Sequence, residues 1–402
     1  GDNPVRVQSM TTTSTLDTEG SVAQCKRIID AGGELVRLTT QGRREAENLA
    51  NISRQLHAEG YTQPLCADIH FNANVADVAA CHTEKVRINP GNYVDPARTF
   101  KHLEYTDEQY AQELEKIEKR LTTFIDLCKK HHTAVRIGVN HGSLSDRIMS
   151  RYGDTPEGIV ESCMEFLRIF RKHNFDDVVI SIKASNTVVM VRSVRLLVAE
   201  MDREDMHYPL HLGVTEAGEG EDGRIKSAVG IGALLADGIG DTIRVSLSEE
   251  PEAEIPVAKH LVRYIRRKQG HLLVPGVQAK NFDYLRPERR KTQAVGPIGG
   301  TQPPVVIVSE VQGAKEGVTL GQEALRPDYI YVGQQMPDLP VEGQRYIVDF
   351  NAFGRELQKH MDVADYMFPI FPYNAMPYIS AVPDTAPIFL VLPYGSCAEE
   401  YK

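Results

Sequence analysis

Eight short apolar runs alternate with longer amphipathic stretches between Val5 and about Lys268, and this alternation constrains the fold more than any other feature. Most of the runs are rich in Val, Ile and Leu, which is typical of parallel strands buried on both faces. We expect strands at Arg6–Met10, Leu35–Thr39, Pro64–Ile69, Lys85–Asn89, Ala134–Asn140, Asp177–Lys183, Pro209–Thr215 and Asp241–Leu247.

The segments between these runs carry helical patterns. Gln109–Lys130 places apolar residues at positions i, i+3, i+4 and i+7. Thr155-Pro156-Glu157 combines an N-cap residue with a proline in the first turn, which indicates where the next helix begins. Eight βα units over about 260 residues match the size of a (β/α)8 TIM barrel. A doubly wound sheet would carry a glycine-rich phosphate loop after its first strand, and none follows. We therefore predict an α/β chain with a TIM barrel at residues 1–268.

The rest of the chain has a different character. Residues 269–303 are rich in Pro, Gly and basic residues and lack periodicity, which predicts a linker or long loop. We interpret its basic run, Arg286–Lys291, as a solvated charge cluster. Residues 304–402 are expected to form all or part of a second, smaller α/β domain, in which Ala364–Tyr378 is an aromatic packing or interface segment. Its expected strands are Val305–Val308, Asp328–Val332, Tyr346–Phe350 and Pro387–Leu392.

Composition excludes several classes of function. Lys and Arg total 45 against 55 Asp and Glu, a net charge of -10, which argues against a general nucleic-acid surface. No apolar run approaches the ~18 residues that a membrane span needs. The six cysteines include no CxxC pair, so we expect reduced thiols rather than a disulfide framework or a zinc site. Against this acidic background, a local group of Arg and Lys is informative.

Such a group occurs on the predicted strands of the barrel. Residues two apart on a strand share a face, and most of these polar residues fall near the carboxyl ends, which form the catalytic face of a TIM barrel. The polar pairs are Arg37/Thr39, Asp68/His70, Arg87/Asn89, Ser181/Lys183 and Arg244/Ser246. In addition, Arg136 and Asn140 flank Gly138 on the fifth strand, and His211 is followed by Thr215 and Glu216 at the end of the seventh.

The signs of these residues indicate the class of ligand. Five cations (Arg37, Arg87, Arg136, Lys183 and Arg244) face two clear anions, Asp68 and Glu216. Burying an unpaired charge costs several kcal/mol, roughly, so a repeated cationic pattern favours a polar ligand. Arginine presents a fork of donors that matches phosphate oxygens, and a compact diphosphate would satisfy the ring.

Other interpretations stay open at this point. A single strand Arg can be a structural ion-pair partner, although the acids are too few to pair every cation. Asp68 and His70 are spaced as a metal-ligand pair, but a third ligand is not evident. Lys183 has the residue type of a Schiff-base lysine.

Eight segments, read in order, resemble the IspG/GcpE family of 4-hydroxy-3-methylbut-2-enyl diphosphate synthases. They are VQSMT (7–11), ADIHF (67–71), RINPGN (87–92), RIGVNHGSL (136–144), SIKAS (181–185), HLGVTEAG (211–218), KSAVGIG (226–232) and GDTIRVSL (240–247). The stretches LEYTDEQY, NHGSLSDRIMSRYGD and VTEAGEGEDGR resemble the large plant and bacterial form, which carries an insert domain after the barrel.

The resemblance implies a reaction and roles for the polar residues. The family reductively opens 2-C-methyl-D-erythritol 2,4-cyclodiphosphate in isoprenoid biosynthesis, by the methylerythritol phosphate route, and expels water. Proton delivery would then fall to Glu216 or His211, and Asp68, His70 and Asn89 would line the site near the carbon skeleton. The diphosphate would be bound by Arg37, Arg87, Arg136, Asn140, Lys183, Arg244 and Ser246.

The sequence departs from the family in one respect. The family's electrons pass through a [4Fe-4S] cluster on a C-terminal domain, but the CPxC motif of that domain is absent and Cys397 stands alone. We therefore expect this chain to bind substrate, to hold no metal or cluster, and to be inactive alone. Alternatives are a Schiff-base or pterin-binding TIM barrel enzyme and a non-catalytic phosphate-binding module.

The resemblance also implies partners and a compartment. The complete enzyme would be an iron–sulfur oxidoreductase that takes electrons from ferredoxin or flavodoxin and forms a homodimer. It would bind neither nucleic acid nor membrane. The expected location is the bacterial cytoplasm, or a plastid if the source is a plant.

Overall fold

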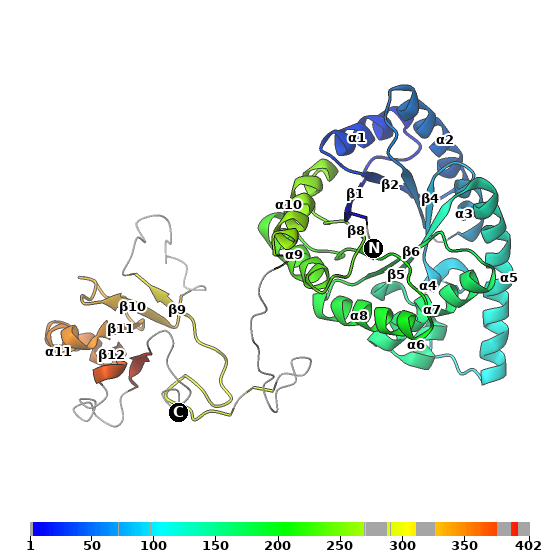
Figure 1. Cartoon of the computed structure of the whole chain (residues 1–402). Helices are drawn as coiled ribbons and strands as arrows, with labels where there is room; N and C mark the ends of the chain where they lie inside the picture. Colours follow the sequence, from blue (N-terminus) through cyan, green and yellow to red (C-terminus); the bar gives the residue numbers. More distant parts are fainter. Residues whose placement is uncertain are drawn as a thin grey trace. The chain divides into compact units, whose positions relative to one another are not determined.

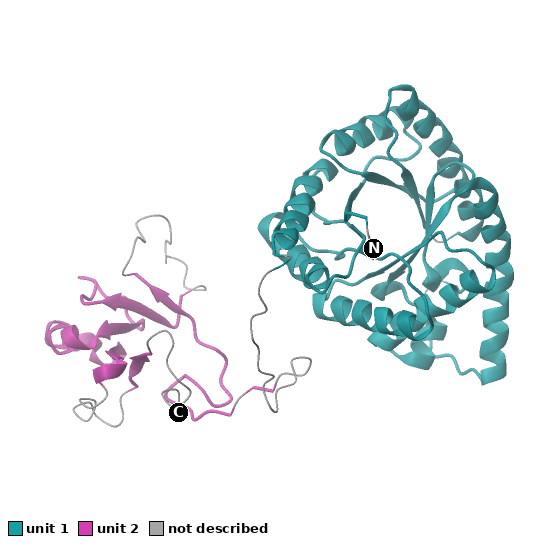
Figure 2. Ribbon diagram, in the orientation of Figure 1, with its two compact units in different colours: residues 1–273 teal, residues 274–402 magenta. Residues whose placement is uncertain are grey.

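The structure, a computed structural model, describes residues 3–70, 72–96, 99–268, 270, 288–289, 291–310, 326–375 and 387–392. The chain divides into two compact units, residues 1–273 and 274–402 (Figure 2). Most of the predicted linker, including much of the basic run Arg286–Lys291, lies outside the described residues, as does Cys397. None of the described helices has the length and apolar character needed to cross a membrane.

The first unit is a ring of eight parallel strands surrounded by helices, as predicted (Figure 1). Hydrogen bonds connect the strands in the order β6-β5-β4-β3-β2-β1-β8-β7, and a bridge from Ile180 to Leu210 joins the two ends. The strands are β1 (Arg6–Met10), β2 (Leu35–Thr40), β3 (Leu65–Ile69), β4 (Lys85–Ile88), β5 (Ala134–Asn140), β6 (Val178–Lys183), β7 (His211–Leu212) and β8 (Thr242–Ile243).

One long helix follows each strand and packs outside the ring. These helices are α1 (Thr18–Asp30), α2 (Arg43–Ala58), α3 (Ala73–Ala80), α5 (Asp107–His131), α7 (Pro156–Lys172), α8 (Thr187–Arg203), α9 (Gly220–Ala236) and α10 (Glu254–Arg266). Shorter elements lie in the loops: α4 (Pro90–Tyr93), η1 (His141–Ser143), α6 (Asp146–Tyr152) and η2 (Pro251–Ala253).

Local sequence determines where two of the predicted helices begin. Thr106 and Gln109 form a capping box at the start of α5, in which each side chain bonds the other residue's backbone amide. The Thr155 side chain caps α7 by accepting from the Gly158 amide, and Pro156 occupies the first turn.

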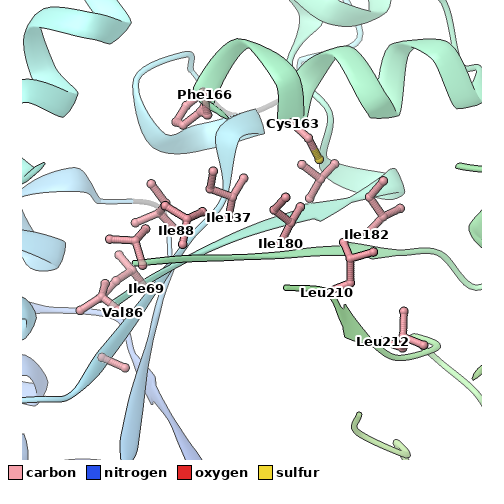
Figure 3. Close-up of a cluster of buried hydrophobic side chains, with 14 of the residues drawn as sticks. Ile69, Val86, Ile88, Ile137, Cys163, Phe166, Ile180, Ile182, Leu210 and Leu212 are labelled. Carbon is pink, nitrogen blue, oxygen red and sulfur yellow. The ribbon is translucent and has the colours of Figure 1, made fainter. Parts of the chain in front are cut away.

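Side-chain alternation along the strands separates the core from the site. On β4, β5 and β6 the apolar residues Ile88, Ile137 and Ile180 point outward and pack beneath Cys163 and Phe166 of α7 (Figure 3). The residues between them on the same strands, including Arg87, Arg136 and Ser181, point into the ring. The packing of the outer face therefore fixes which polar side chains face the interior.

Two barrel strands, β7 and β8, are only two residues long, much shorter than predicted. The prediction for β7 was Pro209–Thr215, but the strand is His211–Leu212; beyond it the Thr215 amide still donates to the carbonyl of Ala184, just after β6, at 3.4 Å. The prediction for β8 was Asp241–Leu247, but the Leu247 amide donates to the Glu254 carboxylate at 3.2 Å.

The second unit is a five-stranded parallel sheet in strictly sequential order, β13-β12-β11-β10-β9. Its core includes Ile330, Tyr346, Val348 and Met367, and α11 (Phe350–Lys359) and η4 (Met361–Tyr366) connect β11 to β12. The strands are β9 (Ile307–Ser309), β10 (Tyr329–Gly333), β11 (Arg345–Asp349), β12 (Met367–Pro372) and β13 (Phe389–Val391). The α/β prediction for this region is confirmed.

Within Ala364–Tyr378, interpreted as an aromatic packing or interface segment, Met367–Pro372 forms a strand that was not predicted, inside the sheet between β11 and β13; its buried Met367 and Phe371 agree with a packing role. Pro369 and Pro372 argued against a central strand. These prolines obscured the alternating burial of the strand, in which Met367, Pro369 and Phe371 are buried. Residues 376–378 lie outside the described part of the chain.

Candidate functional site

A cavity of about 610 Å³ lies at the carboxyl ends of the barrel strands. Side chains from β2 to β6 and from the loops after them line it, together with residues that follow β7 and β8. Eleven of the twelve predicted site residues line this cavity, and His211 does not: Arg37, Asp68, His70, Arg87, Asn89, Arg136, Asn140, Lys183, Glu216, Arg244 and Ser246.

Asp68 is the buried anion of the site. Its carboxylate accepts from Arg37 Nη2 at 2.9 Å and from Arg87 Nη1 at 3.2 Å, and His70 Nε2 lies 3.0 Å away. Burial by itself raises the pKa of this carboxyl, but the two guanidinium charges outweigh burial and hold the pKa well below its usual range. Asp68 therefore stays ionised and holds two arginines in place.

Several arginine donors in the cavity have no partner. Within the described part of the chain, Nε and Nη1 of both Arg37 and Arg136, and Nε of Arg87, are buried without a hydrogen bond. Burial, followed by the charge of Arg37, lowers the pKa of Arg136 to about 9. An orphaned buried donor costs about 1–3 kcal/mol, and more when the group is charged. An anion in the cavity would remove this penalty.

Lys183 extends this cationic field from the end of β6. Its side chain is buried and lines the cavity. Burial, and then the charges of Arg37 and Arg244, hold the pKa of its amine well below the usual range. These effects disfavour the protonated amine, and an anion bound in the cavity would act in the opposite direction.

Arg244 is held by a residue that sequence reasoning missed. Glu254, at the start of α10, is buried and accepts from Arg244 Nε at 3.1 Å and from Nη2 at 3.0 Å. The same carboxylate accepts from the Ser9 hydroxyl at 2.6 Å. The expectation of only two clear anions was therefore wrong, because Glu254 is a third. A search along the strands overlooks a residue on a helix, although the sequence shows Glu254 in the first turn of α10, the helix that follows β8.

The neutral donors divide between the cavity and the fold. Asn89 Nδ2 donates to Ser143 Oγ at 2.8 Å, while Asn89 Oδ1 caps α4 by accepting from the Gly91 amide. Asn140 and Ser246 are half-buried and line the cavity. Asn89 is thus engaged in holding its loop, whereas Asn140 and Ser246 have polar atoms available to a ligand.

The two predicted proton donors lie in different places. Glu216 is exposed at the cavity, where its backbone adopts a left-handed φ of 52°. His211 is buried on β7, where Nδ1 lies 2.7 Å from Thr242 Oγ1 and Nε2 has no partner among the described residues. Burial, and then the charges of Arg136 and Lys183, hold the pKa of His211 well below its usual range, so its imidazole is neutral.

Nothing in the described residues fits an iron–sulfur cluster. A cluster requires about four protein ligands. In the described part of the chain, no three His, Cys, Asp or Glu side chains are grouped so that they could hold a metal ion. Cys25, Cys66, Cys128 and Cys163 are each buried in separate elements, and Cys81 is exposed.

Sequence comparison links this chain to a known family. The GcpE TIM-barrel domain family matches residues 1–259. A Phocaeicola vulgatus protein named 4-hydroxy-3-methylbut-2-en-1-yl diphosphate synthase (flavodoxin) is 62% identical over 389 residues, which are 94% of this chain and 63% of the relative. A Bacteroides thetaiotaomicron protein of the same name is 60% identical over 400 residues, covering 100% of this chain and 63% of its own length.

A plant relative matches a shorter region. The Oryza sativa subsp. japonica protein named 4-hydroxy-3-methylbut-2-en-1-yl diphosphate synthase (ferredoxin), chloroplastic, is 56% identical over 261 residues, 65% of this chain and 35% of the relative. Among solved structures, a Xanthomonas albilineans dihydropteroate synthase covers 67% of this chain and 95% of its own, with 15% identity and a TM-score of 0.43.

Proposed function

The chain belongs to the GcpE family, and on that premise we propose that its barrel is the substrate-binding part of a 4-hydroxy-3-methylbut-2-enyl diphosphate synthase. The substrate would be 2-C-methyl-D-erythritol 2,4-cyclodiphosphate, which is reductively opened with loss of water. The chain spans 63% of the length of each of the two bacterial relatives described above, so the activity of the whole protein is part of this proposal.

The unpartnered arginine donors of the cavity carry the proposal. Arg37, Arg87 and Arg136 leave buried N–H groups unsatisfied, and a diphosphate supplies oxygens with the matching bidentate geometry. Asp68 and Glu254 offset part of the positive charge of the cavity arginines, which remain in excess of these two acids. The net charge of the whole chain is -10, so this local field is what attracts an anionic substrate.

The proposed roles follow from position. Lys183 would take a proton from solvent when the diphosphate binds, because the anion offsets the arginine charges that hold its pKa down. Asp68, His70 and Asn89 would lie near the carbon skeleton, and Glu216 would exchange protons with the substrate from the rim. Neutral His211 would act beneath the cavity rather than in direct contact. The diphosphate would contact Arg37, Arg87, Arg136, Asn140, Lys183, Arg244 and Ser246.

Electrons would come from outside the described residues. We propose that the complete protein carries a [4Fe-4S] cluster elsewhere and accepts electrons from flavodoxin, the donor that the names of the bacterial relatives state. The second unit would then be the insert of the large family form, because the Bacteroides thetaiotaomicron match extends over the whole chain. A homodimer in the bacterial cytoplasm completes the proposal.

A turnover assay tests this function. The complete protein, supplied with the cyclic diphosphate and reduced flavodoxin without oxygen, should release 4-hydroxy-3-methylbut-2-enyl diphosphate. Arg136→Met should lower kcat/KM by at least about 100-fold, because a buried charge-assisted contact is lost. Arg43→Met, which alters an exposed pair with Glu47, serves as the control and should have no effect. Absence of product from the unaltered protein would reject the function.

A further inference from the structure

A histidine–aspartate pair lies at the cavity and was not among the predicted site residues. His141, the first residue of η1 after β5, lines the cavity, and its Nε2 lies 2.5 Å from Oδ1 of Asp154. Asp154 lies in the loop between α6 and α7, so η1 and α6 separate it from β5 along the chain. The side chain of His141 is 27% exposed, so water and substrate can reach it.

The turn that carries His141 is held firmly. Ser143 Oγ donates to the Asn140 carbonyl at 3.2 Å and accepts from Asn89 Nδ2 at 2.8 Å. A methyl group on Gly91 would lie 1.9 Å from the Ser143 carbonyl oxygen, so α4 and η1 are in direct backbone contact. A catalytic side chain needs this kind of rigid support.

The other histidines near the cavity have different environments. His70 lies against Asp68, which also holds Arg37 and Arg87, so it belongs to the anion-binding cluster. His211 is buried and does not line the cavity. His141 lines the cavity and pairs with Asp154, a carboxylate outside the arginine cluster, and such a carboxylate orients an imidazole.

From this arrangement we infer that His141 is a general acid for the loss of water, and that Asp154 is its positioning residue. This inference rests on the proposed function. With Nε2–H donated to Asp154, the proton on Nδ1 passes to the substrate hydroxyl whose C–O bond breaks, and the hydroxyl leaves as water. The C–O bond between the carbon skeleton and the ring phosphate also breaks, with its electron pair staying on the phosphate oxygen, and two electrons from the reduced flavodoxin-type carrier form the carbon–carbon double bond. The imidazole becomes neutral and is reprotonated from solvent.

Kinetics of matched variants test this role. In the complete protein, His141→Asn should lower kcat by about 100- to 1,000-fold, the usual contribution of a general acid, with KM changed less than about threefold. Asp154→Asn should lower kcat by about tenfold, and the double variant should be no slower than His141→Asn. Added imidazole should restore part of the activity of His141→Ala. The control is His207→Asn, which alters an exposed pair with Asp205 away from the cavity and should keep full activity.

Binding and product measurements separate the two ways of failing. If the unaltered protein forms no product, the proposed function fails and this inference fails with it. If the unaltered protein is active but His141→Asn keeps its kcat, only the inference is rejected. A weaker affinity of His141→Asn for the cyclic diphosphate, with kcat unchanged, would make His141 a phosphate ligand and also reject it. Lack of imidazole rescue in a folded His141→Ala protein would assign His141 a structural role.

Discussion

Asp68→Asn is the substitution that most sharply tests how the cavity is held together. The carboxylate is 1% exposed and contacts Arg37, Arg87 and His70 at 2.9, 3.2 and 3.0 Å. Asparagine keeps the shape of the side chain but removes the charge that offsets the two guanidinium groups. Removing one partner of a buried ion pair costs about 3–5 kcal/mol, because the remaining charge is left uncompensated.

This cost converts into a large thermal shift. A domain somewhat larger than 250 residues loses about 2–4 °C in Tm for each kcal/mol, so the barrel of Asp68→Asn should melt about 6–20 °C lower. The matched control is Glu47→Gln, whose pair with Arg43 lies on the surface, with side chains 50% and 77% exposed. An exposed i,i+4 pair contributes about 0.3–0.5 kcal/mol, so the control should shift by about 2 °C at most.

Differential scanning calorimetry of the 402-residue chain at pH 7 measures both shifts. The pKa of Asp68 is lowered by folding, so its contribution is present above the unfolded pKa of about 3.9 and is lost as the pH falls through the folded value. The difference in Tm between Asp68→Asn and the unaltered chain should therefore narrow in acid. If Asp68→Asn melts no lower than Glu47→Gln at pH 7, Asp68 does not organise the arginines and the reasoning fails.

Three further predictions concern the same cavity. Glu254→Gln should weaken diphosphate binding by about tenfold or more without loss of the barrel fold, because Arg244 loses a bidentate partner. Titration calorimetry measures the affinity and circular dichroism checks the fold. An unchanged affinity would refute this prediction. Burial and neighbouring cations lower the pKa of Lys183, so binding of the anion should take up a proton and the affinity should fall as the pH rises. Calorimetric titrations in buffers of different ionisation enthalpy measure this proton uptake, which should be smaller for Lys183→Met. Equal uptake by the two proteins would assign the proton to another group. Gly91→Ala should lower Tm and affinity together, because its methyl group meets the Ser143 backbone at 1.9 Å, and a native Tm would show that the loops yield easily.

The architecture of the barrel could be predicted because burial on both faces leaves a strong sequence pattern. Successive side chains on a strand point to opposite faces, which separates the apolar layer under the helices from the inside of the ring. Ile88 and Ile137 pack in the apolar layer against α7, while Arg87 and Arg136 line the cavity. The strand β12 was not predicted, because prolines such as Pro369 are unusual in a central strand, although Met367 and Phe371 are buried.

The contacts within the site could not be predicted from strand patterns. Glu254 reaches Arg244 from the start of α10, and Asp154 reaches His141 from a loop after α6, so both pairs depend on how separate elements meet. His211 is a residue that the strand pattern predicted at the site but that does not line the cavity. Its strand parity placed it in the ring, but it lies beside Thr242.

Calorimetric titration of 2-C-methyl-D-erythritol 2,4-cyclodiphosphate into the 402-residue chain tests the central claim most directly. We expect one site per chain, an affinity that weakens as salt is added, and loss of binding in Arg136→Met but not in Arg43→Met. An absence of binding heat at millimolar ligand, or equal binding by the two variants, would contradict the claim that the arginine cluster is built to hold a diphosphate.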